Sequence, residues 1–223
     1  MRKVLVLAVH PDDETLGCAG TLLKHKAAGD QLHWVIATTM TQSTNFSKED
    51  IRARKEEIKR VASMYGFKTV TNLMLPTTKV DRFPLNKLVG KISKIFKDIK
   101  PDTVYLPFMN DAHSDHRKIF DAANSVTKVF RNSFIKRVYM METPSETEYA
   151  PALKEFIFVP NYFVDISDYI RKKVEILKVY KSELGKVPFP RSIRNIKSLA
   201  ISRGTQAGCN YAEAFMLLKE IWS

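Results

Sequence analysis

Short apolar runs recur along the chain with the spacing of buried strands. Residues 4–9 (VLVLAV) form an unbroken apolar run, which is the pattern of a strand buried on both faces of a parallel sheet. Residues 32–39 and 103–108 are similarly rich in apolar, aromatic and β-branched side chains. A weaker pattern at 69–75 and an apolar run at 137–141 predict two further strands.

Amphipathic stretches separate these runs. In each of them the apolar residues return about every three to four positions, as they do on one face of a helix. Ser47 and Asp50 have the spacing of a capping box and predict that a helix begins there. The predicted helices cover residues 15–28, 47–66, 84–100 and 115–129.

The last third of the chain has a different pattern. Residues 156–166 predict a strand that is interrupted at Pro160 and Asn161. From Ser167 onward the pattern predicts helices, with breaks at Pro188 and Pro190.

Strands that alternate with amphipathic helices predict a doubly wound α/β fold, because parallel strands need crossover helices between them. No linker or repeat divides the chain, so we expect a single domain over residues 1–223. In such folds ligands bind beyond the carboxyl ends of the strands.

Composition narrows the class of protein. Only two cysteines occur, so we do not expect a disulfide framework. We expect a cytoplasmic protein. No apolar stretch reaches the roughly 20 residues of a membrane span. The net charge of +12 fits either an anionic partner or a lysine-rich surface, and the lysines are spread rather than gathered.

Two clusters of histidine and acidic residues follow predicted strands. His10-Pro-Asp-Asp-Glu14 comes directly after the first strand, and Asp111-Ala-His-Ser-Asp-His116 follows the 103–108 strand. A catalytic zinc site uses three protein ligands and keeps one position for water. His10 and one of the neighbouring aspartates, Asp12 or Asp13, can supply two ligands, while the other carboxylate faces the open position as a general base.

The second cluster supplies the third ligand. Helical spacing places His116 on the same inward face as Ile119 and Phe120, so we expect it to point toward the metal. His113 then stays near the site, where it can polarise a carbonyl group or protonate a leaving amine. Asp115 is expected to orient His113 and to hold its protonated form.

Arg54 is unusual because it falls on the apolar stripe of its predicted helix. A buried arginine needs a partner. Either Arg54 contacts a polar or anionic group of a substrate, or it pairs internally with Glu57, one turn further along.

These motifs resemble the GlcNAc-phosphatidylinositol de-N-acetylase and LmbE-like family. The resemblance rests on residues 10–20 (HPDDETLGCAG) and 113–116 (HSDH), and more weakly on Arg54 with Glu57, on residues 180–182 and on residues 211–215. It implies a Rossmann-like fold and hydrolysis of the N-acetyl amide of an N-acetylglucosamine-type sugar. It also implies that His10, Asp13 and His116 hold Zn²⁺, that Asp12 is the general base, that His113, assisted by Asp115, stabilises the oxyanion, and that Arg54 contacts the substrate.

The chain departs from the family pattern in two places. The segment after the second predicted strand, residues 38–41, lacks the usual glycine, and Ser114 stands where proline is common. Both changes lie at the rim of the expected site, so they bear on the shape of the substrate rather than on the reaction.

Several alternatives remain open at this stage. The same site can cleave a larger sugar-linked amide. Two histidines and one carboxylate also describe a non-heme Fe²⁺ site, although the second aspartate favours hydrolysis. A nucleic-acid-binding role leaves both His/Asp clusters unexplained. We therefore expect a small amino-sugar substrate, with an anionic group and a homo-oligomer as open options, and we expect no nucleic acid and no membrane span.

Overall fold

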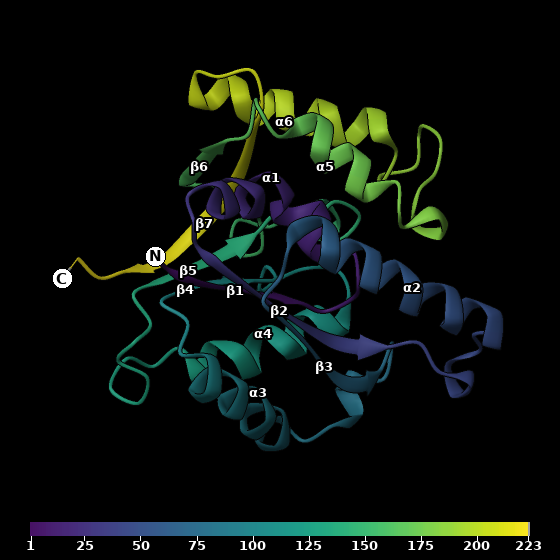
Figure 1. Ribbon diagram of the computed structural model, residues 1–223, viewed down its shortest axis with the longest axis vertical. Helices are drawn as coiled ribbons and strands as arrows, with labels where there is room; N and C mark the ends of the chain where they lie inside the picture. The colour runs from purple at the N-terminus through teal and green to yellow at the C-terminus, as the bar shows by residue number, and fades with distance from the viewer. Residues whose placement is uncertain (223) are drawn as a thin grey trace.

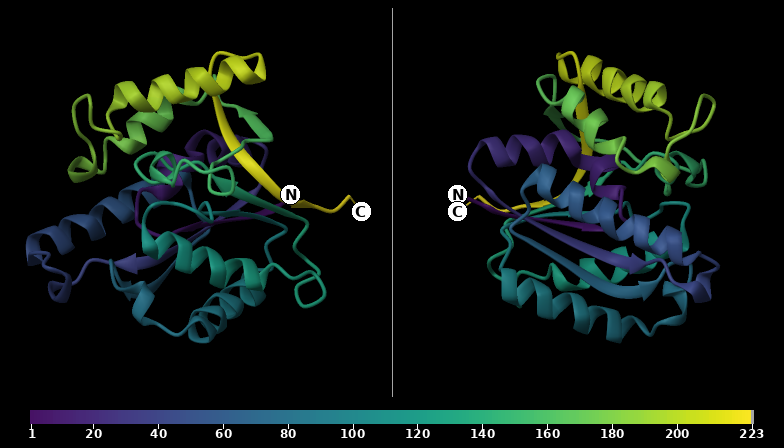
Figure 2. Two further views of the ribbon diagram at one scale, coloured as in Figure 1. Left: turned by 180° about the vertical axis from the view of Figure 1, so that it is seen from behind. Right: turned by 45° about the vertical axis from the view of Figure 1, so that its right-hand side comes forward.

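The computed structural model describes residues 1–222 of the chain and contains one central sheet with helices on both sides (Figures 1 and 2). The strands are β1 (Lys3–Ala8), β2 (Gln31–Thr39), β3 (Thr69–Pro76), β4 (Thr103–Leu106), β5 (Arg137–Met141), β6 (Tyr162–Asp165) and β7 (Ala212–Glu220). The helices are α1 (Asp13–Ala27), α2 (Lys48–Tyr65), α3 (Leu85–Ile99), α4 (Ser114–Val126), α5 (Ile170–Leu177) and α6 (Ile193–Ala207).

The strand order across the sheet is β3-β2-β1-β4-β5-β7-β6. The first five strands of the chain pair in parallel, and β7 is antiparallel to both β5 and β6. The predicted doubly wound, mostly parallel α/β fold is therefore confirmed. The chain leaves β1 toward β2 on one side and returns to β4 on the other, so the strand order switches direction beside β1.

Each face of the sheet has its own apolar core. Helices α3 and α4 cover one face, and α1, α2 and α5 lie over the other, with α6 further out (Figure 1). On the first face Ile92 and Phe96 of α3 meet Ile119 of α4, and all three are fully buried. Complete burial of one such side chain contributes about 1.5–3 kcal/mol, so the periodic apolar positions of the sequence account for this packing.

The C-terminal third departs from the sequence-based prediction in two ways. Residues 156–161 are irregular, and the strand is confined to Tyr162–Asp165. Residues 212–220, predicted as helix, form β7 between β5 and β6. The segment contains good helix formers such as Ala, Met and Leu, but pairing with strands on both sides overrides that local preference.

Helix α1 is broken in the middle, at Cys18, whose backbone is not helical (φ −147°, ψ 25°). The break leaves backbone groups without their usual partners four residues away. Glu213 of β7 accepts hydrogen bonds from the Gly20 and Thr21 amides at 2.9 and 2.8 Å, and Lys173 of α5 donates to the Leu16 carbonyl at 2.8 Å.

Lys173 and Glu213 also pair with each other at 2.8 Å, and both are almost fully buried. The first turns of α1 are thus attached to β7 and α5. Gly20 is required at this contact, because a Cβ atom there would lie 2.5 Å from Ile166.

Within residues 1–222, none of the helices has the length and apolar character needed to cross a membrane.

Candidate functional site

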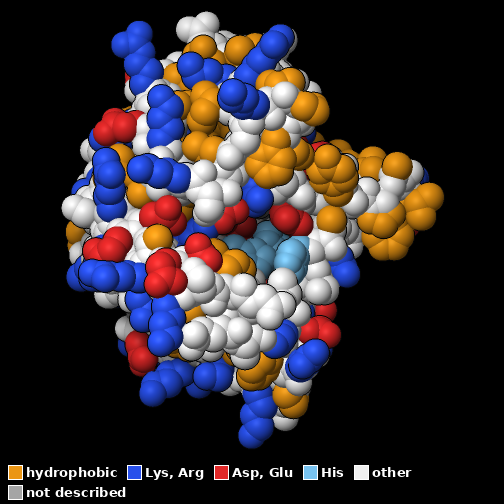
Figure 3. Space-filling model, turned by 90° about the vertical axis from the view of Figure 1, so that its right-hand side faces the viewer, with side chains coloured by type: hydrophobic (Ala, Val, Ile, Leu, Met, Phe, Trp, Pro, Cys, Tyr) orange, Lys and Arg blue, Asp and Glu red, His pale blue; other side chains and the backbone are white. Residues whose placement is uncertain are grey.

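The two His/Asp clusters of the sequence meet at the carboxyl ends of β1 and β4, which are neighbours in the sheet. They line a cavity of about 330 Å³, within the range of roughly 300–1,000 Å³ that is common for small-molecule sites. Histidine side chains lie at the bottom of this hollow and acidic side chains along its edge (Figure 3). Its lining comprises His10, Pro11, Asp12, Asp13, Thr38, Met40, Phe46, Arg54, Thr77, His113, Ser145, Glu146, Glu183 and Arg191.

His10, Asp13 and His116 form a group that can hold a metal ion. Each offers a ligand atom, and these atoms lie within 4.8 Å of one another. His116 Nε2 is 3.2 Å from His10 Nδ1 and 3.5 Å from Asp13 Oδ2. The turn after β1 fixes this arrangement, because Asp13 Oδ2 accepts hydrogen bonds from the amides of Val9 and His10 at 2.8 Å each.

A buried carboxylate orients His116. His116 Nδ1 lies 2.8 Å from Asp111 Oδ2, and the hydroxyl of Thr147 donates to the other oxygen of Asp111 at 2.7 Å. In the neutral ring, with the proton of Nδ1 directed at Asp111, the Nε2 lone pair faces His10 and Asp13, as a metal ligand requires. Burial lowers the pKa of His116, but the carboxylates of Asp13 and Asp111 outweigh burial and raise it to about 9.

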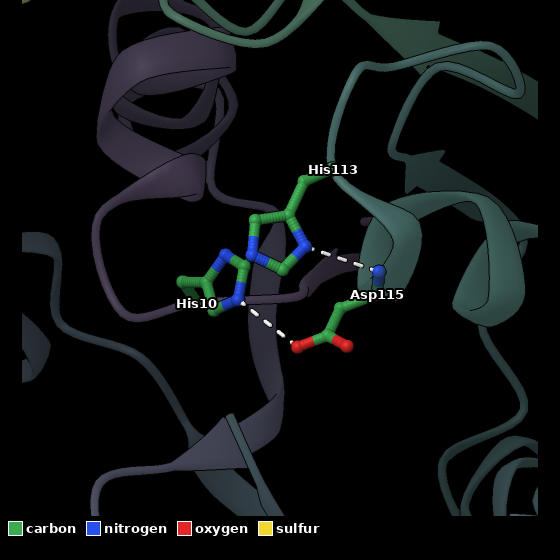
Figure 4. Close-up of side chains that lie close together, drawn as sticks. All are labelled: His10, His113 and Asp115. Atoms are coloured by element: carbon green, nitrogen blue, oxygen red, sulfur yellow. Dashed lines mark hydrogen bonds and ion pairs between the residues drawn. The ribbon is translucent and has the colours of Figure 1, made fainter. Parts of the chain in front are cut away.

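A second group, His10, His113 and Asp115, also brings three possible ligands together (Figure 4). In this group the neutral ring of His113 has no lone pair free for a metal, because its Nδ1 already accepts a hydrogen bond. Asp115 Oδ2 accepts from the Thr78 amide at 2.7 Å, and Asp115 Oδ1 accepts from the Val80 amide at 3.1 Å. His113 Nδ1 accepts from the Asp115 amide at 3.1 Å. The first group is therefore the better candidate for a metal centre.

Asp115 contacts His113 in a different way from the one predicted. Its backbone amide, rather than its carboxylate, bonds to His113, because His113 is the N-cap of α4. The carboxylate faces His10 instead, with 3.5 Å between Asp115 Oδ2 and His10 Nε2. Since His113 Nδ1 is an acceptor, Nε2 carries the proton of the neutral ring. Burial, and then the neighbouring His10, lower the pKa of His113 to about 4.

Asp12 is buried at the cavity wall and has an unused acceptor. Among residues 1–222, no group donates a hydrogen bond to Asp12 Oδ2, and the nearest cation, Arg191 Nη1, is 3.6 Å away. Burial raises the pKa of Asp12 well above its usual range, and the carboxylates of Asp13 and Glu183 raise it further.

Arg54 reaches the cavity, and its guanidinium group is paired within the protein. Arg54 Nε lies 3.1 Å from Glu57, the internal partner that the sequence suggested, and Nη2 pairs with Glu183. Nη1 donates to the Pro11 carbonyl at 2.7 Å. Of the two sequence-based alternatives for Arg54, internal pairing is the one that these contacts describe.

Several residues of the site are not evident from the sequence alone. Asp111 stood within the second cluster, and its position five residues before His116 was a usable signal. Glu146 has no such signal in the sequence. In the structure its carboxylate accepts a hydrogen bond from the His113 amide at 3.1 Å. Glu183, at the end of a short 3-10 helix, and Arg191 come from the segment between α5 and α6, and only the folded chain brings them to the cavity.

A larger cavity, of about 490 Å³, opens at the other end of the parallel strands. Tyr105, Tyr139 and Tyr162 line it together with His25 and Arg137. It contains none of the site residues predicted from the sequence.

Comparisons with known proteins bear on the family and on the fold. Residues 5–127, more than half of the chain, match the family model described as PIG-L, GlcNAc-PI de-N-acetylase. The chain is 25% identical over 236 residues to the diacetylchitobiose deacetylase of Thermococcus kodakarensis, covering 100% of this chain and 85% of that protein.

Solved structures share the fold. The N,N′-diacetylchitobiose deacetylase from Pyrococcus horikoshii, complexed with an inhibitor, superposes with a TM-score of 0.77 at 23% identity, over 98% of this chain and 84% of that one. The 4-carboxy-2-hydroxymuconate hydratase from Pseudomonas putida KT2440 gives a TM-score of 0.75 at 17% identity, over 100% and 98%. Because the second protein is a hydratase, the fold alone does not decide the reaction.

The sequence match decides the family where the fold does not. It includes the turn after β1 and the start of α4, which carry both His/Asp clusters. The resemblance drawn from the sequence is therefore confirmed: the chain belongs to the PIG-L, or GlcNAc-PI de-N-acetylase, family, and it is an N-deacetylase.

Proposed function

We propose that the protein hydrolyses the N-acetyl amide of a GlcNAc-type sugar or sugar conjugate in a zinc-dependent reaction that releases acetate and a free amine. One observation carries this proposal: a cluster of three possible metal ligands lies beside a buried carboxylate, that of Asp12, which has an unused lone pair. Asp12 Oδ2 has no hydrogen-bond donor among residues 1–222, and the next residue belongs to the cluster.

His10, Asp13 and His116 fit a zinc ion by their chemistry. Two imidazoles and one carboxylate are the ligands of many catalytic zinc sites. The raised pKa of His116 indicates that its surroundings favour a positive charge, which either a proton or a metal ion supplies. When zinc is bound, it lowers the pKa of a water molecule and polarises the amide carbonyl.

Asp12 serves as the general base. Its free oxygen accepts a proton from the attacking water, and the raised pKa of the buried carboxyl lets it retain that proton. The same group then gives the proton to the nitrogen as the C–N bond breaks, so that the leaving group departs as a neutral amine. One carboxylate thus performs both transfers.

His113 stabilises the developing negative charge on the carbonyl oxygen. With its pKa lowered to about 4, the ring is neutral near pH 7 and donates through Nε2–H. The Asp115 amide fixes this tautomer by donating to Nδ1. Of the two roles that the sequence left open for His113, the neutral tautomer favours polarisation of the carbonyl over protonation of the amine.

The polar cavity supports a sugar as the substrate. Carboxylates, hydroxyls and two arginines line it, and these groups can bond to the hydroxyls of a sugar ring. The similar protein from Thermococcus kodakarensis is named as a deacetylase of diacetylchitobiose, a GlcNAc disaccharide. That name supports the same class of substrate for this chain.

Acetate release tests the proposal. The metal-free protein, the zinc-loaded protein and the iron(II)-loaded protein are each assayed with free GlcNAc, diacetylchitobiose, a GlcNAc nucleotide diphosphate and a GlcNAc inositol phosphate. We expect acetate from at least one compound with the zinc-loaded protein and none without metal. Release by the metal-free protein at the same rate would refute the metal dependence, and silence of both loaded forms would refute the substrate class.

A further inference from the structure

The backbone of Asp12 has a conformation that L-residues rarely adopt. Its φ is 150° and its ψ is −24°, in a region where glycine is favoured. Such strain costs free energy and persists only where the surroundings hold the residue in place. The side chain that we assign as the general base therefore projects from a backbone that something must hold.

Both ends of the peptide unit before this residue are held by side chains. Arg54 Nη1 donates to the Pro11 carbonyl at 2.7 Å, and the Asp12 amide donates to Glu14 Oε2 at 3.1 Å. The carbonyl and the amide belong to one rigid plane. The two bonds therefore fix the orientation of that plane, and with it the φ angle of Asp12.

Arg54 is committed to this position by its other nitrogens. Nη2 donates to Ser182 Oγ at 3.1 Å and pairs with Glu183, while Nε lies 3.1 Å from Glu57. All three guanidinium nitrogens thus have protein partners, and the residue is 5% exposed. Of the five N–H groups of the guanidinium, only the second N–H of Nη1 is left for a contact with a substrate.

Glu14 is completely buried and is equally constrained. Its Oε1 accepts from the hydroxyls of Thr15 and Tyr180 at 2.6 and 2.8 Å, which leaves Oε2 for the Asp12 amide. Tyr180 also lies beneath Arg54, with 5.4 Å between the guanidinium carbon and the ring centroid. One tyrosine therefore connects the two groups that hold the peptide.

We propose that Arg54 and Glu14 are positioning residues that clamp the Pro11–Asp12 peptide and thereby aim the Asp12 carboxylate at the reacting water. This inference rests on the proposed function, because it acts through Asp12 as general base. It assigns Arg54 to the rate of the reaction rather than to the binding of the sugar. It also gives Glu14 and Tyr180 a purpose beyond packing.

The test combines substitutions at the clamp with a substitution of the base. Arg54→Met and Glu14→Met remove the two bonds, and Glu14→Gln keeps a carbonyl acceptor. Arg60→Met and Glu56→Gln, on the exposed face of α2, are matched controls. Each variant is made in the wild-type protein and in Asp12→Asn, and kcat, KM, zinc content and melting temperature are measured with the compound that releases most acetate.

We expect each clamp substitution to lower kcat by about 10- to 100-fold, since displacement of a catalytic group by about 1 Å has effects of this size. KM and zinc content should stay close to the wild-type values, and Glu14→Gln should recover part of the rate lost in Glu14→Met. In the Asp12→Asn background the same substitutions should cause no further loss. If Glu14→Met fails to fold, Arg54→Met and Glu14→Gln carry the test.

Equal losses in both backgrounds would overturn the clamp, because the two residues would then act independently of Asp12. A rise in KM with unchanged kcat for Arg54→Met would also overturn it and would make Arg54 a substrate contact. A failure of the proposed function has a different signature: Asp12→Asn alone would then keep the wild-type rate, whatever the clamp variants do.

Discussion

His116 occupies an unusual position for a histidine, fully buried between the carboxylates of Asp13 and Asp111. These charges raise its pKa to about 9, so the metal-free protein carries a proton there at neutral pH. A metal ion needs the neutral ring, and binding must therefore release that proton. Below pH 9 the proton on His116 therefore competes with zinc, and this competition weakens as the pH rises.

We predict that the apparent zinc association constant increases about tenfold per pH unit between pH 7 and pH 8.5. Calorimetry in buffers of different ionisation enthalpy should detect the release of about one proton per zinc ion at pH 7. Asp111→Asn removes one of the two carboxylates and should reduce that release. A zinc affinity that does not change with pH would contradict this account of His116.

At the scale of single residues, the sequence was informative where chemistry and spacing coincided. His10, His116 and one of the two aspartates could be predicted to converge because the carboxyl ends of parallel strands meet at one edge of the sheet. The choice of Asp13 over Asp12 came from the family resemblance. Arg191 could not be predicted, because the segment that carries it has no periodic pattern. The strained backbone of Asp12 was equally hidden, since its cause is a set of contacts from three separate parts of the chain.

At the scale of elements, the broken helix α1 depends on Lys173 and Glu213. Glu213 bonds to two amides that the break at Cys18 leaves free, and Lys173 bonds to the Leu16 carbonyl. Removing one member of a buried, hydrogen-bonded ion pair typically costs about 3–5 kcal/mol. We predict a loss of this size in the free energy of unfolding for Glu213→Ala, measured by denaturant titration.

Glu220→Ala is the matched control for this prediction. Glu220 also lies on β7, but its pair with Arg137 is partly exposed, and such pairs are worth about 0–1 kcal/mol. Equal effects of the two substitutions would show that the Lys173–Glu213 pair does not support α1.

The elements that alternate regularly were predictable, and the C-terminal ones were not. The parallel strands and their crossover helices have strong apolar periodicity, so five strands and four helices fall near their predicted positions. Strand β7 was predicted as helix because its residues favour helix locally. Its true state depends on β5 and β6, to which it is hydrogen-bonded across long sequence separations.

At the scale of the whole molecule, surface and cavity differ in charge. The chain has a net charge of +12, and lysine and arginine side chains are spread over the face that Figure 3 shows. The cavity itself holds the carboxylates of Asp12, Asp13, Glu146 and Glu183. The net charge of the chain therefore does not describe the charge of the cavity. For this reason the sequence alone could not decide whether the sugar is neutral or anionic.

The most direct test of the account compares acetate release by the zinc-loaded wild-type protein and by zinc-loaded Asp12→Asn. Asparagine keeps the size of the side chain and the three metal ligands, and it removes the group that accepts the proton. We predict equal zinc content and a kcat that is lower by about 10²- to 10⁴-fold, the usual contribution of a general base. An Asp12→Asn protein that holds zinc and releases acetate at the wild-type rate would contradict the central claim.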